Sequence, residues 1–173
     1  MSTAAIIVAA GRGTRAGGDV PKQWQMLGGR SVAAHTLQVF ADHPAIDAVI
    51  LVMHADDIAA GYAPDLDTCI VAGGDTRAAS VRAGLMAADG HDLVLIHDAA
   101  RPLFTETTID DVISALSTHD GAAPAIAVTD TLWHGDNDHV TGMQDRAGLF
   151  SAQTPQGFVR APLLAAHLAC DTD

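Results

Sequence analysis

The chain has 173 residues, of which 49% are hydrophobic and 17% charged, so it is long enough for one domain with a sizeable apolar core. Its 21 acidic residues outnumber its 9 lysines and arginines, and the formal net charge is −12. General binding to nucleic acid or to an anionic membrane requires a basic face, and we therefore expect neither kind of partner.

Five apolar runs predict the strands of the fold. Because these runs are apolar on both faces of a strand, they are typical of a parallel sheet that is covered by helices. The runs are residues 4–10, 48–53, 69–72, 93–97 and 122–128.

Apolar residues at helical spacing lie between these runs. A first helix is predicted after Ser31, a candidate N-cap, a second after Asp75, which we expect to cap it, and a third over residues 107–119. The alternation of strands and helices predicts an α/β fold with a doubly wound, mostly parallel sheet.

The pattern changes from Asp130 onward. Two short alternating runs lie on either side of residues 135–138, a pattern that predicts a β-hairpin. A lone hairpin is marginally stable, so we expect this arm, about residues 129–146, to pack on something, such as a second copy of the chain. A final helix is predicted to begin at Arg160, and residues 1–173 read as a single domain.

The cysteines and the first apolar run indicate a cytoplasmic protein. Cys69 and Cys170 are far apart and match no metal or redox spacing, which fits reduced thiols. Residues 4–10 follow no basic segment and are too short to span a bilayer, so we recognise no targeting signal.

Positive charge gathers near the N-terminus. Residues 1–41 carry a net charge of +3, whereas the remainder carries −15. A positive island on an acidic protein indicates a small anionic ligand, and the alternative is a solvated loop with scattered arginines. The basic residues of the island, which include the only lysine of the chain, are Arg12, Arg15, Lys22 and Arg30.

This island lies on a glycine-rich segment that follows the first strand. Gly11 and Gly13 let the backbone approach a phosphate closely. The glycines do not match GxGxxG, because Ala16 occupies the third position, and the segment lacks the Gly-Lys-Ser/Thr of a P-loop. We therefore assign Arg15 and Lys22 to charge stabilisation in nucleotidyl or phosphoryl transfer, with a flexible surface turn as the weaker alternative.

A second glycine-containing segment, residues 72–80, also follows a predicted strand. Gly73 and Gly74 allow close contact with a ligand, and Asp75 and Ser80 can hydrogen-bond a base or a sugar. The alternative is a glycine turn with a helix cap.

The fourth strand is followed by charged residues. The carboxylate of Asp98 can hold a divalent cation between protein and phosphates, and Arg101 suits a second anionic group. Their alternative roles are a helix cap and a salt bridge. We expect His97 to be a satisfied, partly buried histidine with a structural role.

Several motifs occur in a fixed order along the chain: AAGRGTR, PKQ, GGDTRAASV, HDAARP, Asp130-Thr131, Asp145-Arg146 and, from Thr154, TPQ. Together they resemble the 2-C-methyl-D-erythritol 4-phosphate cytidylyltransferase family, from Ile6 to about Ala166. The resemblance implies a nucleotidyltransferase fold with a hairpin arm that swaps across a homodimer. It also implies Mg²⁺-dependent transfer of a cytidylyl group from CTP to 2-C-methyl-D-erythritol 4-phosphate, with release of pyrophosphate, in non-mevalonate isoprenoid synthesis.

The resemblance further implies a role for each candidate residue. Arg15 and Lys22 are catalytic and stabilise charge on the α-phosphate, and Asp98 lies beside the magnesium and the ribose. The remaining nucleotide-binding residues are Ala9, Ala10, Gly11, Gly13, Gly74, Asp75 and Ser80. The residues expected to bind the polyol phosphate, some of them from the partner subunit, are Arg101, Thr131, Arg146 and Thr154.

Members of this family continue beyond the position of Asp173 with a strand and a helix that carry a substrate-binding lysine, and we expect both elements to be missing here. The chain is then a truncated form, a natural short form, or the front of a fusion to the cyclodiphosphate synthase of the same pathway. Two other functions stay open: transfer to another polyol phosphate, such as ribitol 5-phosphate, and nucleotide binding without full activity.

Overall fold

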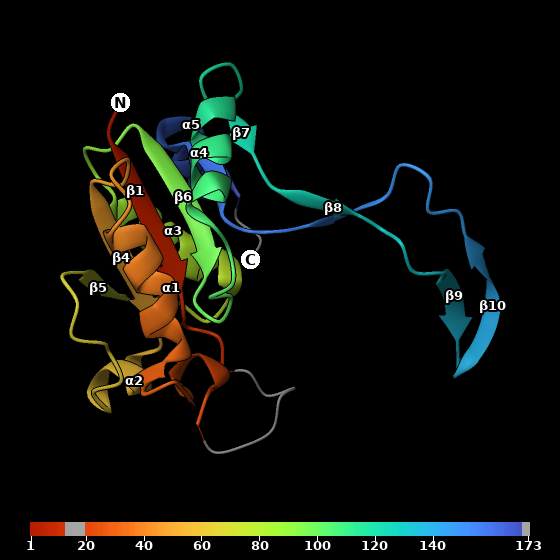
Figure 1. Ribbon diagram of the computed structural model, residues 1–173, viewed down its shortest axis with the longest axis horizontal. Helices are drawn as coiled ribbons and strands as arrows, with labels where there is room; N and C mark the ends of the chain where they lie inside the picture. The colour runs from red at the N-terminus through yellow and green to blue at the C-terminus, as the bar shows by residue number, and fades with distance from the viewer. Residues whose placement is uncertain (13–19, 171–173) are drawn as a thin grey trace.

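A six-stranded sheet forms the centre of the computed structural model, which describes residues 1–12 and 20–170 (Figure 1). Its strand order is β5-β4-β1-β6-β12-β7. The first four strands in this order are mutually parallel, and β12 pairs antiparallel with both of its neighbours. The strands are β1 (Thr3–Val8), β4 (Ala48–Met53), β5 (Cys69–Ala72), β6 (Leu93–Asp98), β7 (Gly121–Ala122) and β12 (Gln156–Val159).

Helices cover both faces of this sheet, as the sequence pattern predicts. Successive side chains of β1 point to opposite faces, so that Ala5 and Ile7 belong to one apolar cluster and Ala4 and Ile6 to the other. The first cluster is completed by α1 (Val32–Ala41) and α4 (Glu106–Ala115), and the second by α3 (Arg77–Ala87) and α5 (Arg160–Ala169). The α/β, doubly wound, mostly parallel arrangement is therefore confirmed.

The structure confirms one predicted helix cap and corrects the other. Ser31 caps α1, because its side chain accepts a hydrogen bond from the backbone N–H of Ala34. Asp75 does not cap α3. The helix begins one residue later than expected, at Arg77, and the side chain of Thr76 accepts the hydrogen bond from Ala79 N–H instead. Asp75 is thereby left exposed ahead of the helix.

Residues 122–128 do not form the fifth parallel strand that their apolar character predicts. The segment divides at Pro124, whose missing N–H cannot join a ladder. Only β7 stays in the central sheet, whereas β8 (Ala125–Ala127) pairs outside it with β11 (Phe150–Ala152) and is exposed. The place beside β6 is taken by β12, an antiparallel strand that the sequence analysis missed.

The predicted hairpin arm is present. It consists of β9 (Leu132–Asp136) and β10 (His139–Gln144), which pair antiparallel. The turn residues Asn137 and Asp138 have φ values of 47° and 63°, the left-handed conformation that a tight two-residue hairpin turn requires. Figure 1 shows this arm at the end of the β8–β11 ribbon, well away from the central sheet.

Short elements connect the layers near the end of β1. They are η1 (Lys22–Trp24), β2 (Met26–Leu27), β3 (Arg30–Ser31) and α2 (Ala55–Ala59). Within the described part of the chain, every helix is too short or too polar to cross a membrane.

Candidate active site

A cavity of about 830 Å³ lies at the carboxyl ends of the parallel strands. β1 is the central strand of this edge, because the chain continues to β4 and β5 on one side of it and to β6 on the other. Open α/β sheets bind ligands at such a topological switch point. Main-chain hydrogen bonds hold the strand ends together, with Ala9 N–H donating to Val52 O (2.7 Å) and Gly73 N–H donating to Met53 O (2.8 Å).

The start of the glycine-rich segment lines this cavity through its backbone. Ala9, Ala10 and Gly11 are all part of the lining. The side chain of Gln23 is buried and donates hydrogen bonds from Nε2 to the carbonyls of Ala9 (2.8 Å) and Gly11 (3.0 Å). Gln23 therefore joins the two ends of the segment.

Two of the predicted residues cannot be placed. Gly13 and Arg15 lie outside the described residues. Their expected roles in phosphate binding and charge stabilisation remain predictions.

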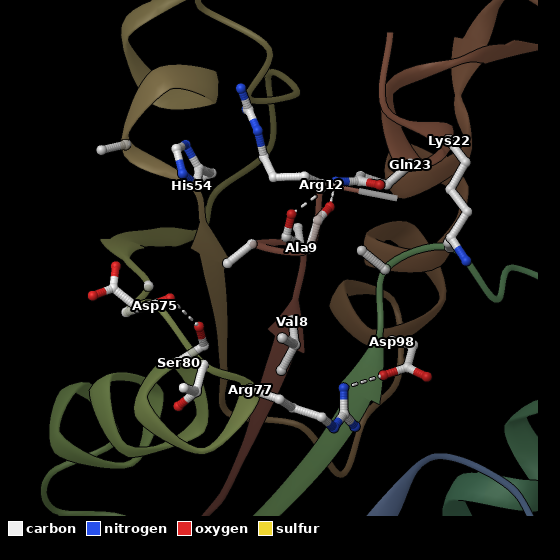
Figure 2. Close-up of a pocket in the computed structure, with 18 of the residues that line it drawn as sticks. Val8, Ala9, Arg12, Lys22, Gln23, His54, Asp75, Arg77, Ser80 and Asp98 are labelled. Carbon is white, nitrogen blue, oxygen red and sulfur yellow. Dashed lines mark hydrogen bonds and ion pairs between the residues drawn. The ribbon is translucent and has the colours of Figure 1, made fainter. Parts of the chain in front are cut away.

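Lys22 is the first residue of η1 and lines the cavity. In the view of Figure 2, Lys22 and Asp98 lie on one side of the cavity, and Asp75 and Ser80 lie on the other. Among the described residues, the ammonium group of Lys22 has no carboxylate partner within 4.0 Å. A cation without a protein counter-ion is suited to contact a ligand phosphate.

The residues expected to read the nucleotide base meet on the β5 side of the cavity. Gly74, Asp75 and Ser80 all line it. Ser80 is buried, and its hydroxyl donates to Gly74 O (3.2 Å). At Gly73 a Cβ atom would lie 2.7 Å from both Ala10 Cβ and Ser80 Oγ, so only glycine allows this close approach of the two loops.

Asp98 lies between two arginines at the end of β6. Its Oδ1 accepts from Arg77 Nη1 (2.7 Å) and its Oδ2 accepts from Arg101 Nε (3.1 Å). Arg101 also donates to the side chain of Gln153 (2.9 Å). The alternative role of Arg101 as a salt-bridge partner is therefore observed, and Asp98 caps no helix of the described chain.

Basic side chains outnumber acidic ones in the cavity lining, although the protein as a whole is acidic. Its described lining contains four basic side chains and two acidic ones. Such an arrangement attracts a polyanion such as a nucleoside triphosphate. The basic residues are Arg12, Lys22, Arg77 and Arg101, and the acidic residues are Asp75 and Asp98.

The remaining residues assigned to the polyol phosphate lie outside the cavity lining. Thr131 and Arg146 flank the hairpin of the arm, where Arg146 donates a hydrogen bond to Thr129 O. Thr154 lies just before β12, and its Oγ1 is buried without a partner among the described residues. Within one copy of the chain, Arg101 is thus the sole member of this group that the structure brings to the described cavity.

His97 is less completely satisfied than expected. The ring is fully buried and packs against Phe40 and Phe104, which also contact each other, and Nε2 lies 3.0 Å from Arg101 O. Nδ1 has no hydrogen-bond partner in the described part of the molecule. Burial lowers the pKa of His97 to about 4, so that at neutral pH the ring is uncharged and Nε2–H donates to the carbonyl.

Gln23, His54 and Arg77 are among the lining residues to which the sequence analysis gave no role. Gln23 was quoted within the PKQ motif without a role, and Arg77 within GGDTRAASV. A usable signal existed for Arg77, because a basic residue in the first turn of a helix that follows a strand lies at the ligand-binding edge. For His54, which follows β4, the same position after a strand was the sole clue.

Comparison with known proteins agrees with this geometry. Residues 3–173 match the family described as "IspD: 2-C-methyl-D-erythritol 4-phosphate cytidylyltransferase". The chain is 54% identical over 169 residues to the enzyme of that name from Roseobacter denitrificans, covering 96% of this chain and 76% of the relative. It is also 55% identical over 172 residues to the "Bifunctional enzyme IspD/IspF" of Ruegeria pomeroyi, covering 98% of this chain and 45% of that relative.

Solved structures show the same similarity. The Francisella tularensis 2-C-methyl-D-erythritol 4-phosphate cytidylyltransferase superposes with a TM-score of 0.82 at 27% identity, covering 98% of this chain and 78% of that one. A 4-diphosphocytidyl-2C-methyl-D-erythritol synthase from Anaerococcus prevotii superposes with a TM-score of 0.80 at 31% identity, over 99% and 77% of the two chains. The chain therefore belongs to the 2-C-methyl-D-erythritol 4-phosphate cytidylyltransferase family.

Proposed function

We propose that this chain transfers the cytidylyl group of CTP to 2-C-methyl-D-erythritol 4-phosphate and releases pyrophosphate, a step of isoprenoid synthesis. The observation that carries the proposal is the cationic cavity at the carboxyl edge of the sheet, into which Lys22 projects without a counter-ion among the described residues. The names of the family and of its relatives favour this acceptor over ribitol 5-phosphate.

The reaction needs positioning and charge stabilisation and no covalent intermediate. A phosphate oxygen of the polyol phosphate attacks the α-phosphorus of CTP, and the bond from that phosphorus to the bridging oxygen of the β-phosphate breaks as pyrophosphate leaves. Lys22, together with Arg15, stabilises the negative charge that builds on the α-phosphate oxygens. Gly74, Asp75 and Ser80 hold the cytosine, and the backbone of Ala9 to Gly11 faces the phosphates.

A divalent cation, which we propose to be Mg²⁺, fits this site only together with its substrate. The described residues include no cluster of three or more His, Cys, Asp or Glu side chains that could hold a metal ion. Asp98 offers one carboxylate at the cavity, which matches the habit of Mg²⁺ of combining one or two carboxylates with substrate phosphates. When bound, the ion would neutralise phosphate charge, and Asp98 would hold it. Each Asp98 carboxylate oxygen accepts one hydrogen bond from an arginine and has a further lone pair for a cation.

The polyol phosphate site is proposed to be completed by a second copy of the chain. Thr131 and Arg146 are on the projecting arm, whereas Arg101 lies in the cavity. The arm also exposes large apolar side chains, as a segment that packs on a partner does. Among them are Trp133 (65% exposed), Val140 (59%) and Met143 (74%). A homodimer in which each arm reaches the cavity of the other subunit accounts for both observations.

We also propose a cytoplasmic location, because both cysteines, Cys69 and Cys170, are free thiols.

The proposed reaction is tested by measuring pyrophosphate release from CTP with 2-C-methyl-D-erythritol 4-phosphate and, in parallel, with ribitol 5-phosphate, each with and without MgCl₂. Turnover with the first acceptor and Mg²⁺ is the expected result. Faster turnover with ribitol 5-phosphate would show that ribitol 5-phosphate, and not 2-C-methyl-D-erythritol 4-phosphate, is the acceptor. Calorimetric binding of CTP without any turnover would show a nucleotide-binding fragment instead.

A further inference from the structure

The carboxylate of Asp57 connects Arg12 with Trp24, which lies two residues after Lys22. Its Oδ1 accepts from Arg12 Nη1 (2.9 Å) and its Oδ2 accepts from Trp24 Nε1 (2.8 Å). Asp57 belongs to the short helix α2 and does not line the cavity. Of its two partners, Arg12 lines the cavity, and Trp24 is next in sequence to Gln23, which also lines it.

The carboxylate of Asp57 is buried, so it depends on its contacts with Arg12 and Trp24. Asp57 is 3% exposed and Trp24 is 4% exposed. A buried carboxylate is tolerated only when charge and hydrogen bonds compensate its lost hydration, and here the guanidinium and the indole N–H do so. The ring of Trp24 also stacks on Tyr62, with ring centroids 6.0 Å apart and an interplanar angle of 8°.

These contacts have a direct consequence for Lys22. Lys22, Gln23 and Trp24 form one turn of 3₁₀ helix, so an anchor on Trp24 orients the residue at the other end of that turn. Gln23 adds its hydrogen bonds to Ala9 O and Gly11 O within the same turn. Lys22 itself has no ion-pair partner among the described residues, and its place in the cavity therefore depends on its neighbours.

We propose that Asp57 is a positioning residue for nucleotidyl transfer, which places Lys22 through Trp24 and the start of the glycine-rich segment through Arg12. This inference rests on the proposed function for the reaction that Lys22 serves. Residues that orient metal ligands from behind contribute about 10–100-fold to activity, and we expect an effect of the same order for a residue that orients a catalytic lysine.

The substitution Asp57→Asn tests this role because it preserves size and removes the charge and one acceptor. The amide NH₂ must then face either the Arg12 guanidinium or the Trp24 indole N–H, a donor against a donor. We expect kcat to fall about 10–100-fold, while the calorimetric Kd for CTP changes less than about threefold, because the residues assigned to cytosine are untouched.

Asp56→Asn is the matched control. Asp56 is the adjacent carboxylate and also contacts Arg12, at 3.3 Å, but its side chain is 70% exposed. An exposed ion pair contributes little, so kcat should stay within about twofold of wild type. An equal loss of kcat in both variants would overturn the assignment to Asp57.

Trp24→Phe provides a second variant in case Asp57→Asn does not fold. It removes the indole N–H and preserves an aromatic ring for the stack on Tyr62. We expect a smaller fall in kcat, about 3–10-fold, because only the Trp24 contact with Asp57 is lost. The double variant Trp24→Phe/Asp57→Asn should have the kcat of Asp57→Asn alone, since that substitution already disturbs the same contact. A folded Trp24→Phe or Asp57→Asn protein with wild-type kcat would disprove the proposal.

A readout without turnover separates this proposal from the proposed function. Lys22 is the only lysine of the chain, so the rate at which an acetylating N-hydroxysuccinimide ester labels it can be followed by mass spectrometry. We expect CTP to slow labelling in the wild type and in Asp56→Asn but not in Asp57→Asn. This pattern in a protein that fails to turn over would refute the proposed reaction and leave the positioning role intact, whereas equal protection in all three proteins would refute the role.

Discussion

Single residues decide whether the cavity can do chemistry, and Lys22 is the clearest case. It is a cation on a one-turn helix at the edge of a sheet, close to main-chain groups that can face phosphates. Asp98, at the same edge, is instead shared between two arginines. The two residues therefore differ in charge balance: the ammonium group of Lys22 has no carboxylate partner among the described residues, whereas the charge of Asp98 is already compensated by two guanidinium groups.

We predict that Lys22→Ala lowers kcat by about 10²–10³, the effect of removing one donor that stabilises transition-state charge. The fold should be unchanged, because the ammonium group has no ion-pair partner among the described residues. Pyrophosphate release measures kcat, and circular dichroism measures the fold. Arg82→Ala, which removes a cation outside the cavity lining, is the control; turnover of Lys22→Ala close to wild type would remove the main catalytic assignment.

His97 should make the protein sensitive to mild acid. Burial lowers its pKa from 6.5 to about 4 in the folded protein, so between these values the unfolded chain binds a proton and the folded chain does not. The free energy of unfolding therefore falls as the pH falls through this window, by about 2 kcal/mol at pH 5, and His97 has no effect well above pH 6.5.

Urea unfolding of metal-free protein at pH 7.5 and pH 5 measures this loss. His97→Gln removes the titrating ring. Between pH 7.5 and pH 5, the free energy of unfolding of this variant should therefore fall by about 2 kcal/mol less than that of the wild type. The exposed His134→Gln should lose as much stability as the wild type. Equal losses in the wild type and His97→Gln would contradict the prediction.

At the scale of elements, the cavity exists because helices pack closely on both faces of the sheet. Gly84 marks the closest approach of α3, since a Cβ there would lie 2.4 Å from Ile6 Cγ2 and 3.1 Å from Val52 Cγ2. The contacted residues belong to β1 and β4, whose carboxyl ends form the cavity. Packing in the middle of the helix thus sets the distance between the two loops at its end.

We predict that Gly84→Ala destabilises the protein by about 1–3 kcal/mol, the usual cost of overpacking a core. At an exposed helix position, replacing glycine by alanine would stabilise the protein by about 1 kcal/mol. A destabilising effect at Gly84 would therefore show that α3 packs closely on the sheet there. Chemical denaturation gives the free energy of unfolding. Met86→Ala, at a position 62% exposed on the same helix, should be nearly neutral; a stabilised Gly84→Ala protein would mean that α3 lies farther from the sheet.

The arm dominates the architecture at the scale of the whole molecule. β8 and β11 carry the hairpin away from the central sheet, and together they expose apolar side chains such as Ile126 (62%) and Phe150 (63%). A structure of this kind buries little of its own surface along the arm. In the proposed dimer, the partner subunit covers these apolar side chains, and its arm carries the residues that complete the polyol phosphate site.

Complementation between subunits tests this arrangement. Lys22→Ala and Arg146→Ala should each be nearly inactive alone, because each removes one group from every site. In a purified heterodimer of the two variants, one site combines an intact Lys22 with an intact Arg146 from the other subunit, so roughly half of wild-type turnover should return. An inactive heterodimer would show that Arg146 acts within its own chain, and a monomer in sedimentation velocity would remove the dimer altogether.

Much of the core was predictable from local patterns. The runs 48–53 and 69–72 are strands with the expected bounds, and Ser31 caps α1. These predictions succeed because hydrophobic periodicity and capping act within a few residues of sequence. They also place Ala9 to Gly11, Asp75 and Asp98 at one edge, since parallel strands bring their carboxyl ends together.

Other features depend on contacts between distant residues. The run 122–128 is apolar enough for a buried strand, yet Pro124 and the competing pairing of β12 with β6 exclude most of it from the sheet. Asp75 and Thr76 are both capable caps, and the folded chain uses Thr76. No local pattern links Asp57 to Trp24, which are 33 positions apart in the chain.

The sequence by itself therefore determined the fold class, the edge of the sheet where the ligand site lies and the chemical character of the side chains there, because these follow from short-range periodicity and residue chemistry. The tertiary structure alone decided which side chains touch: the arginines on Asp98, the anchor of Trp24 on Asp57, and the separation of Thr131 and Arg146 from the cavity. Such contacts depend on how whole elements pack, and packing is a property of the folded chain.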